Sequence, residues 1–177
     1  AWVTPEKDTR YLRIAILAAY KATAKGDEPY ASVLVGPDGE FLYEGLNTSQ
    51  TGGDITAHGE MNICRWATRN YDAAFLWQCS IYVPGSPCPM CACAIFYSNI
   101  GRMVNATSIY DKRGHGQWAL PSLKLTALEI FRHGNKDIVI DGPYPELADE
   151  CMEKLEGFDP MKIAFYAQSA RNLMPRE

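Results

Sequence analysis

The chain has 177 residues, of which 47% are hydrophobic and 21% charged, a composition typical of one globular domain with its own core. Its net charge of −4 and isoelectric point near 5.4 argue against a protein whose main partner is nucleic acid, because phosphate binding needs clustered lysine and arginine. No apolar run reaches about 18 residues, which excludes a transmembrane helix, and the first residues lack the apolar segment of a signal peptide, so we expect a cytoplasmic protein.

Helices and strands alternate along the chain after an opening hairpin. The first helix has an amphipathic pattern that Asp8 or Thr9 can cap and Gly26 ends, and the turn GPDG joins the first two strands. The expected elements, in chain order, are helix 8–25, strands 31–35 and 40–46, helix 58–70, strand 80–85, helix 88–99, strand 102–108, helix 122–133, strand 137–140 and helix 145–158. This order predicts an α/β protein in which a mixed sheet has helices on both faces.

The chain contains no internal repeat, low-complexity linker or block of like charges. We therefore expect a single domain over residues 1–177. Residues 158–177 form a C-terminal tail with three aromatic side chains, Phe158, Phe165 and Tyr166. We expect this tail to cap a pocket or to contact a partner subunit.

Three of the six cysteines lie close together in the stretch SPCPMCAC. Cys88 and Cys91 are spaced i, i+3 at the predicted start of a helix, where such positions lie on one face. The helix N-terminus also favours the thiolate, which is the form that binds metal. Cys93 lies about 200° round the helix from Cys91, so we expect it to point into the core. The spacing of Cys88 and Cys91 predicts a metal site rather than a disulfide.

His58 is the upstream donor that completes this set, in the stretch TAHGEMN. His115 and His133 are alternatives, but neither has a partner at ligand spacing. One histidine and two cysteines leave the fourth position of a zinc ion open for water, which is the pattern of a catalytic zinc site. Zinc lowers the pKa of its bound water toward about 7 and so provides hydroxide at neutral pH.

Glu60 lies two residues after His58. Such residues face different directions within a helix, but they meet at one site where a loop enters the helix, because the first residue has non-helical angles. Glu60 is then a candidate general acid and base. Alone, the H-x-E pair is a weak signal, and a lone C-x-x-C also fits a structural zinc or a redox pair. The two motifs together, each at a helix start, are far more specific.

TAHGE together with SPCPMC resembles the H-x-E and P-C-x-x-C signature of the cytidine-deaminase-like zinc-dependent enzymes. The hairpin EPYASVLVGPDGEFLYEGLN and the segment YSNIGRMVNATS extend the resemblance over about residues 8–155. The chain looks similar to the branch that includes cytosine, guanine and tRNA adenosine deaminases. The resemblance implies a three-layer α-β-α sandwich with a five-stranded mixed sheet, and a homodimer.

The resemblance also implies roles for single residues. His58, Cys88 and Cys91 fall on the ligands of one zinc ion per chain, and Glu60 falls on the proton shuttle. Substrate contacts are implied for the Asn47 side chain, which is otherwise a turn former after a strand, and for the backbone of Ala57 and Gly59. The position of Gly59 is commonly alanine in the branch, and glycine there is also seen in yeast-type cytosine deaminases.

The implied activity is hydrolytic release of ammonia from an aminated nucleobase, nucleoside or related heterocycle, by zinc-bound hydroxide with Glu60 as proton carrier. The acidic charge balance favours a small-molecule substrate. A tRNA adenosine is the second candidate, and the same charge balance makes nucleic acid an unlikely partner. Guanine is disfavoured because the loop at 109–121 carries only Asp111 where guanine deaminases have an acidic pair. In this loop, Tyr110, His115 and Trp118 are candidates to close over the substrate, and Trp118 is equally a candidate core residue. A non-catalytic zinc-binding domain is the remaining alternative.

Overall fold

The computed structural model describes residues 4–107, 123 and 125–156. Its sheet contains five strands in the order β2-β1-β3-β4-β5. β1 pairs antiparallel with β2 and β3, while β3, β4 and β5 are parallel to one another. The strands are β1 (Ala31–Val35), β2 (Phe41–Leu46), β3 (Ser80–Gly85), β4 (Arg102–Thr107) and β5 (Val139–Asp141). The expected five-stranded mixed sheet is confirmed.

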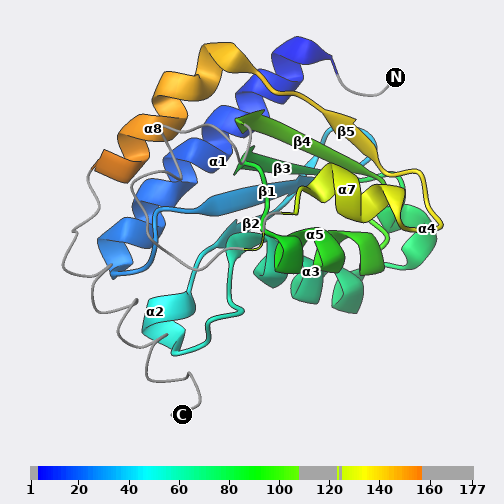
Figure 1. The fold of residues 1–177 in the computed structure, drawn as a ribbon, viewed down its shortest axis with the longest axis horizontal. Helices are drawn as coiled ribbons and strands as arrows, with labels where there is room; N and C mark the ends of the chain where they lie inside the picture. The colour runs from blue at the N-terminus through cyan, green and yellow to red at the C-terminus, as the bar shows by residue number, and fades with distance from the viewer. Residues whose placement is uncertain (1–3, 108–122, 124, 157–177) are drawn as a thin grey trace.

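Helices cover both faces of this sheet (Figure 1). On one face lie α1 (Pro5–Lys25), the 3-10 helix η1 (Pro145–Leu147) and α8 (Ala148–Glu156), and on the other lie α3 (Gly59–Asn70), α5 (Pro89–Tyr97) and α7 (Ala127–Arg132). The first core includes Leu12, Val33, Tyr82 and Leu147. The second includes Leu34, Ile63, Ile81, Ile95 and Phe131. The three-layer sandwich therefore matches the expected architecture.

Several boundaries differ from those expected. α1 begins at Pro5, because the Thr4 side chain accepts a hydrogen bond from the Lys7 amide and proline is favoured in a first turn; it ends at Gly26, which has a left-handed φ of 97°. α7 spans only Ala127–Arg132, since a capping box between Thr126 and Glu129 fixes its start.

Two four-residue helices were not predicted, because a single turn has no periodic pattern to detect. α2 (Ser49–Gly52) lies between the expected strand 40–46 and the expected helix 58–70, and α4 (Ala73–Leu76) follows the capping residue Asp72. β5 begins at Val139 rather than at residue 137. Within the described residues, no helix has the length and apolarity needed to cross a bilayer.

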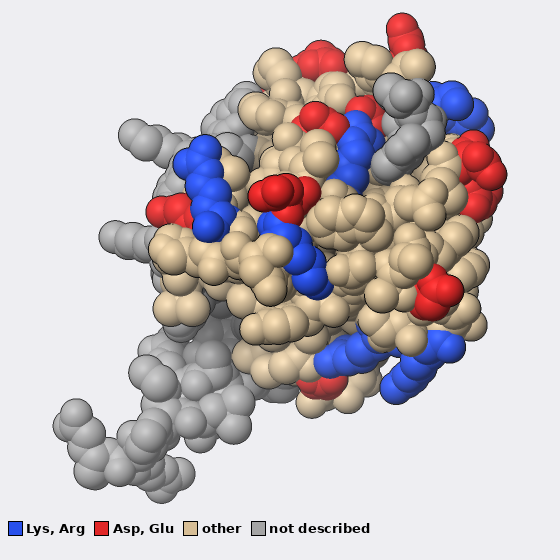
Figure 2. Space-filling model, turned by 90° about the vertical axis from the view of Figure 1, so that its right-hand side faces the viewer, with Lys and Arg blue, Asp and Glu red and all other residues tan. Residues whose placement is uncertain are grey.

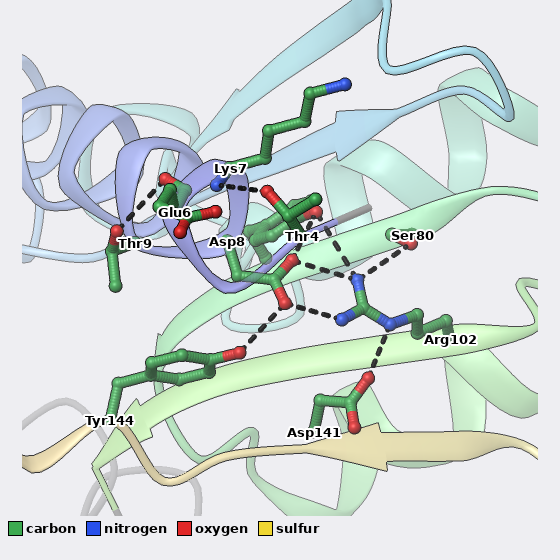
Figure 3. Close-up of polar contacts among 10 residues, drawn as sticks. Thr4, Glu6, Lys7, Asp8, Thr9, Ser80, Arg102, Asp141 and Tyr144 are labelled. Atoms are coloured by element: carbon green, nitrogen blue, oxygen red, sulfur yellow. Dashed lines mark hydrogen bonds and ion pairs between the residues drawn. The ribbon is translucent and has the colours of Figure 1, made fainter. Parts of the chain in front are cut away.

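A buried polar network joins α1 to the parallel half of the sheet (Figure 3). Asp8 forms an ion pair with Arg102, with Oδ2 and Nη2 2.6 Å apart. The hydroxyls of Tyr82 and Tyr144 each donate to Asp8 over 2.8 Å, and Arg102 Nε donates to Asp141 over 2.6 Å. Because its members come from α1, β3, β4, β5 and the segment before η1, the network fixes the sheet against its first helix.

Candidate metal centre

His58 and Cys88 occupy equivalent positions at the starts of two neighbouring helices. His58 is the N-cap of α3, with φ −69° and ψ 159°, and Cys88 is the N-cap of α5, with φ −65° and ψ 163°. Both residues are therefore extended, and the helix begins one residue later. Pro89 at the first position of α5 favours this start. The helix expected from residue 58 thus begins at Gly59, with His58 as its N-cap, so the expected entry of the chain into the helix at His58 is confirmed.

The three predicted ligand residues come together in space. Nδ1 of His58 lies 3.7 Å from Sγ of Cys88 and 3.5 Å from Sγ of Cys91, and the three atoms all lie within 4.8 Å of one another. A tetrahedral zinc ion with Zn–S near 2.3 Å and Zn–N near 2.05 Å requires N···S separations of about 3.6 Å. The two observed N···S distances bracket this value, so they suit a shared zinc ion.

The acid–base states of these groups are coupled. A hydrogen bond from Cys91 lowers the pKa of the Cys88 thiol to about 4; burial opposes this, and His58 acts in the same direction as Cys91. The same hydrogen bond, with burial, raises the pKa of Cys91. Burial acts to lower the pKa of His58, but its contact with Cys88 and the charge of Glu60 raise it to about 9. The lowered pKa of Cys88 favours the thiolate, which is the form that binds a metal ion.

Glu60 lies beside the three donors, in the first turn of α3. Its side chain is buried and it interacts electrostatically with His58 and Cys88 and by a hydrogen bond with Cys91. Burial raises the pKa of its carboxyl above the ordinary value. A carboxyl with a raised pKa holds a proton more readily than an ordinary glutamate, so this group is suited to take up and return one beside a metal centre.

Asn47 lies fully buried at the end of β2. Its Oδ1 accepts hydrogen bonds from the amide of Ser49 (2.9 Å) and from its hydroxyl (2.8 Å). Its Nδ2 donates to Oε2 of Glu28 over 3.1 Å. The side chain is thus held by two neighbours, and the predicted contact between Asn47 and a substrate stays a prediction.

The backbone of Ala57 is engaged within the protein, while that of Gly59 faces the sheet. The Ala57 amide donates to Asp54 and its carbonyl accepts from Thr48, each over 2.9 Å. Gly59 lies against the backbone of Gly45 and of Ser32. Their predicted contacts with a substrate remain predictions.

The other residues singled out in the sequence are not part of the metal centre that the structure describes. Trp118, together with Tyr110, Asp111 and His115, lies outside the described residues, as does the tail at 158–177. His133 is exposed at the end of α7, where its Nδ1 lies 2.8 Å from the Glu129 carbonyl oxygen. Cys93 was expected in the core but is exposed. The prediction was wrong because Cys91 itself faces the protein interior, so the opposite side of α5 faces solvent.

Glu28 is the residue near the centre that sequence reasoning missed. It is buried, and its charge acts on His58. Burial raises the pKa of its carboxyl, while His58 and the Asn47 amide act to lower it. The available signal was an acid directly before Pro29 and the first strand, at the sheet end to which the hairpin also brings Asn47.

The chain is similar in sequence to known deaminases. The model of the cytidine and deoxycytidylate deaminase zinc-binding region matches residues 5–107. A tRNA-specific adenosine deaminase of Haemophilus influenzae is 32% identical over 158 residues, which cover 89% of this chain and 86% of that protein. A probable cytosine deaminase of Schizosaccharomyces pombe is 30% identical over 159 residues, covering 86% of this chain and 93% of the relative.

Solved structures share the fold. A guanine deaminase from Nitrosomonas europaea has a TM-score of 0.70 at 17% identity, covering 92% of this chain and 86% of that one. A deaminase that edits the wobble position of transfer RNA has a TM-score of 0.62 at 24% identity, covering 83% of this chain and 99% of that one. At these identities the similarity confirms the three-layer architecture.

Proposed function

Because the chain belongs to the cytidine and deoxycytidylate deaminase family, whose matched region binds zinc, we propose that it hydrolytically releases ammonia from an aminated nucleobase, nucleoside or related heterocycle. His58, Cys88 and Cys91 hold one zinc ion, and Glu60 moves the proton. The observation that carries this proposal is the meeting of three metal donors within 4.8 Å of one another and the buried Glu60 beside them.

When bound, zinc supplies a Lewis acid that activates a water molecule for attack on the amino-bearing carbon. The chain's own residues bind the ion and transfer the proton. His58, Cys88 and Cys91 would hold the ion, and a set of three protein donors would allow water to reach it. The Glu60 carboxyl accepts a proton from the attacking water and donates it to the departing nitrogen, for which its raised pKa is suited. Burial of Glu60 keeps bulk water from competing for that proton.

A small heterocycle is the favoured substrate. The net charge is −4, and Figure 2 shows lysine, arginine, aspartate and glutamate side chains interspersed on one face of the described molecule rather than gathered by sign. Phosphate binding relies on a continuous basic surface. A tRNA adenosine is the second candidate, which the 32% identity to a tRNA-specific adenosine deaminase supports.

The test uses the Glu60→Ala variant. We expect it to retain about one zinc ion per chain and to lose ammonia release by at least about 100-fold, because a general acid–base group contributes about 10²–10⁴-fold. Zinc is measured by elemental analysis. Ammonia release is measured with each of the following substrates: cytosine, cytidine, guanine, adenine, adenosine, aminated triazines and a tRNA transcript with an adenosine at the wobble position. Normal turnover by Glu60→Ala overturns the mechanism, and a wild type without activity on any of these substrates favours a non-catalytic zinc domain.

The homodimer and the cytoplasmic location expected from the sequence remain predictions. Sedimentation of the purified chain tests the first, and fractionation of cells that express it tests the second.

A further inference from the structure

Glu28 and Asn47 are brought together by the first two strands. The hairpin pairs Ala31 with Leu46, and the Asn47 amide continues this pairing by donating to the Tyr30 carbonyl over 2.9 Å. The Glu28 carbonyl accepts from the Tyr30 amide over 2.7 Å, which makes a tight turn about Pro29. The position of Glu28 is therefore set by the backbone.

One oxygen of the Glu28 carboxyl is held and the other is not. Oε2 accepts from Asn47 Nδ2 over 3.1 Å. Oε1 has no hydrogen-bond partner among the described residues, although the Glu28 side chain is only 8% exposed. Every fully buried side-chain nitrogen or oxygen of the described residues has a hydrogen-bond partner. Since Oε1 has none, this atom is not fully buried and can be reached from outside the packed core.

The segment that holds Glu28 runs beside the metal centre, because the amide of Thr48, next to Asn47, donates to the carbonyl of Ala57, the residue before His58, over 2.9 Å. The Glu28 charge acts on His58 and Cys88. Burial first, and then the charges of both Glu28 and Glu60, raise the pKa of the Tyr30 hydroxyl, so both carboxyls act on this side chain. The function proposed for Glu60 leaves Glu28 without a role.

We infer that Glu28, held by Asn47, is a specificity-determining residue whose free oxygen accepts a hydrogen bond from a second amino group on the substrate ring. This inference rests on the proposed deaminase function. A carboxylate accepts hydrogen bonds and cannot donate one, so it attracts an N–H group and repels a carbonyl oxygen. Because the carboxyl is recessed, a group that projects from the ring reaches it better than a ring N–H. The substrate class is a diamino heterocycle.

Two pairs of free bases test the inference, since each pair differs by an amino group or a carbonyl at one ring carbon. They are 2,4-diaminopyrimidine with cytosine, and 2,6-diaminopurine with isoguanine. We expect the zinc-loaded wild type to have the higher kcat/KM for the diamino member of each pair. Glu28→Gln should shift this ratio by at least about 10-fold toward the carbonyl member, mainly through KM, because the glutamine amide donates to a carbonyl.

The matched control is Asp27→Asn. Asp27 is the neighbouring buried carboxylate, and both its oxygens are used inside the protein, by the amides of Gln50 and Thr51 and by the Thr51 hydroxyl. This variant should leave the diamino-to-carbonyl ratio unchanged. An unchanged ratio in Glu28→Gln, or an equal loss on both members of a pair, overturns the inference while leaving ammonia release, and so the proposed function, intact.

A binding measurement separates the two proposals further. Calorimetry with the zinc-loaded Glu60→Ala variant should show the diamino probe bound at least about 10-fold more tightly than its carbonyl partner, and Glu28→Gln in that background should abolish the difference. This result supports the role of Glu28 even if the wild type proves inactive. Equal affinities for the two members of each pair overturn it.

Discussion

The backbones of Gly45 in β2 and Gly59 in α3 are in direct contact. A Cβ atom built on Gly59 would lie 2.5 Å from the Gly45 carbonyl oxygen, and one built on Gly45 would lie 2.3 Å from the Gly59 carbonyl oxygen. This contact lets the first turn of α3 lie against the hairpin. It therefore fixes the residues on either side of Gly59, which are the metal donor His58 and Glu60, the proposed proton carrier.

Gly59→Ala should lower the free energy of unfolding by about 1–3 kcal/mol, because the new methyl group meets backbone that is held in the β-ladder. Displacement of α3 should also reduce the zinc content. Urea unfolding and elemental analysis check both effects. Gly52→Ala is the control, since a Cβ there meets nothing within 4 Å; equal stability of the two variants would contradict the steric argument.

Cys91 and Cys93 provide a second matched pair, this time for the metal. Cys91 is completely buried beside His58, whereas Cys93 is exposed on the same helix. Cys91→Ala should lose zinc, because only two donors remain. Cys93→Ala should keep about one ion per chain.

Removal of zinc with a strong chelator should lower the melting temperature of the wild type and of Cys93→Ala, because a ligand that binds the folded state stabilises it. The same treatment should leave Cys91→Ala unchanged. Zinc retained by Cys91→Ala at the wild-type level would refute the assignment of the three donors.

The metal centre was predictable because its signals are local. The spacing of Cys88 and Cys91, and the entry of His58 and Glu60 into a helix, are written in short stretches of sequence whose helix starts the structure confirms. Cys93 shows the limit of such reasoning. Helical periodicity gives the angle between Cys91 and Cys93 correctly, but it does not say which side of the helix the rest of the fold will cover.

The role of Glu28 was hidden for a different reason. Its environment depends on residues from three separate segments, since Asn47 holds one oxygen and His58 lies close by. From the sequence alone, Glu28 before Pro29 indicates only a turn. Its neighbours become known only with the register of the strands. Asn47 illustrates the same effect. From the sequence it was expected to form a turn or to contact the substrate, and neither expectation included its hydrogen bond to the Glu28 carboxyl.

Asp8 and Arg102 are 94 residues apart in the sequence and form a buried ion pair, with side chains 3% and 12% exposed. Asp8→Ala should lower the free energy of unfolding by about 3–5 kcal/mol, because it leaves the guanidinium buried without this partner. Glu150→Ala breaks the Arg13–Glu150 pair, whose side chains are 50% and 40% exposed, and should cost only about 0–1 kcal/mol. Urea unfolding of both variants checks the contrast. Similar losses in the two would show that the network in Figure 3 contributes no more than a surface pair does.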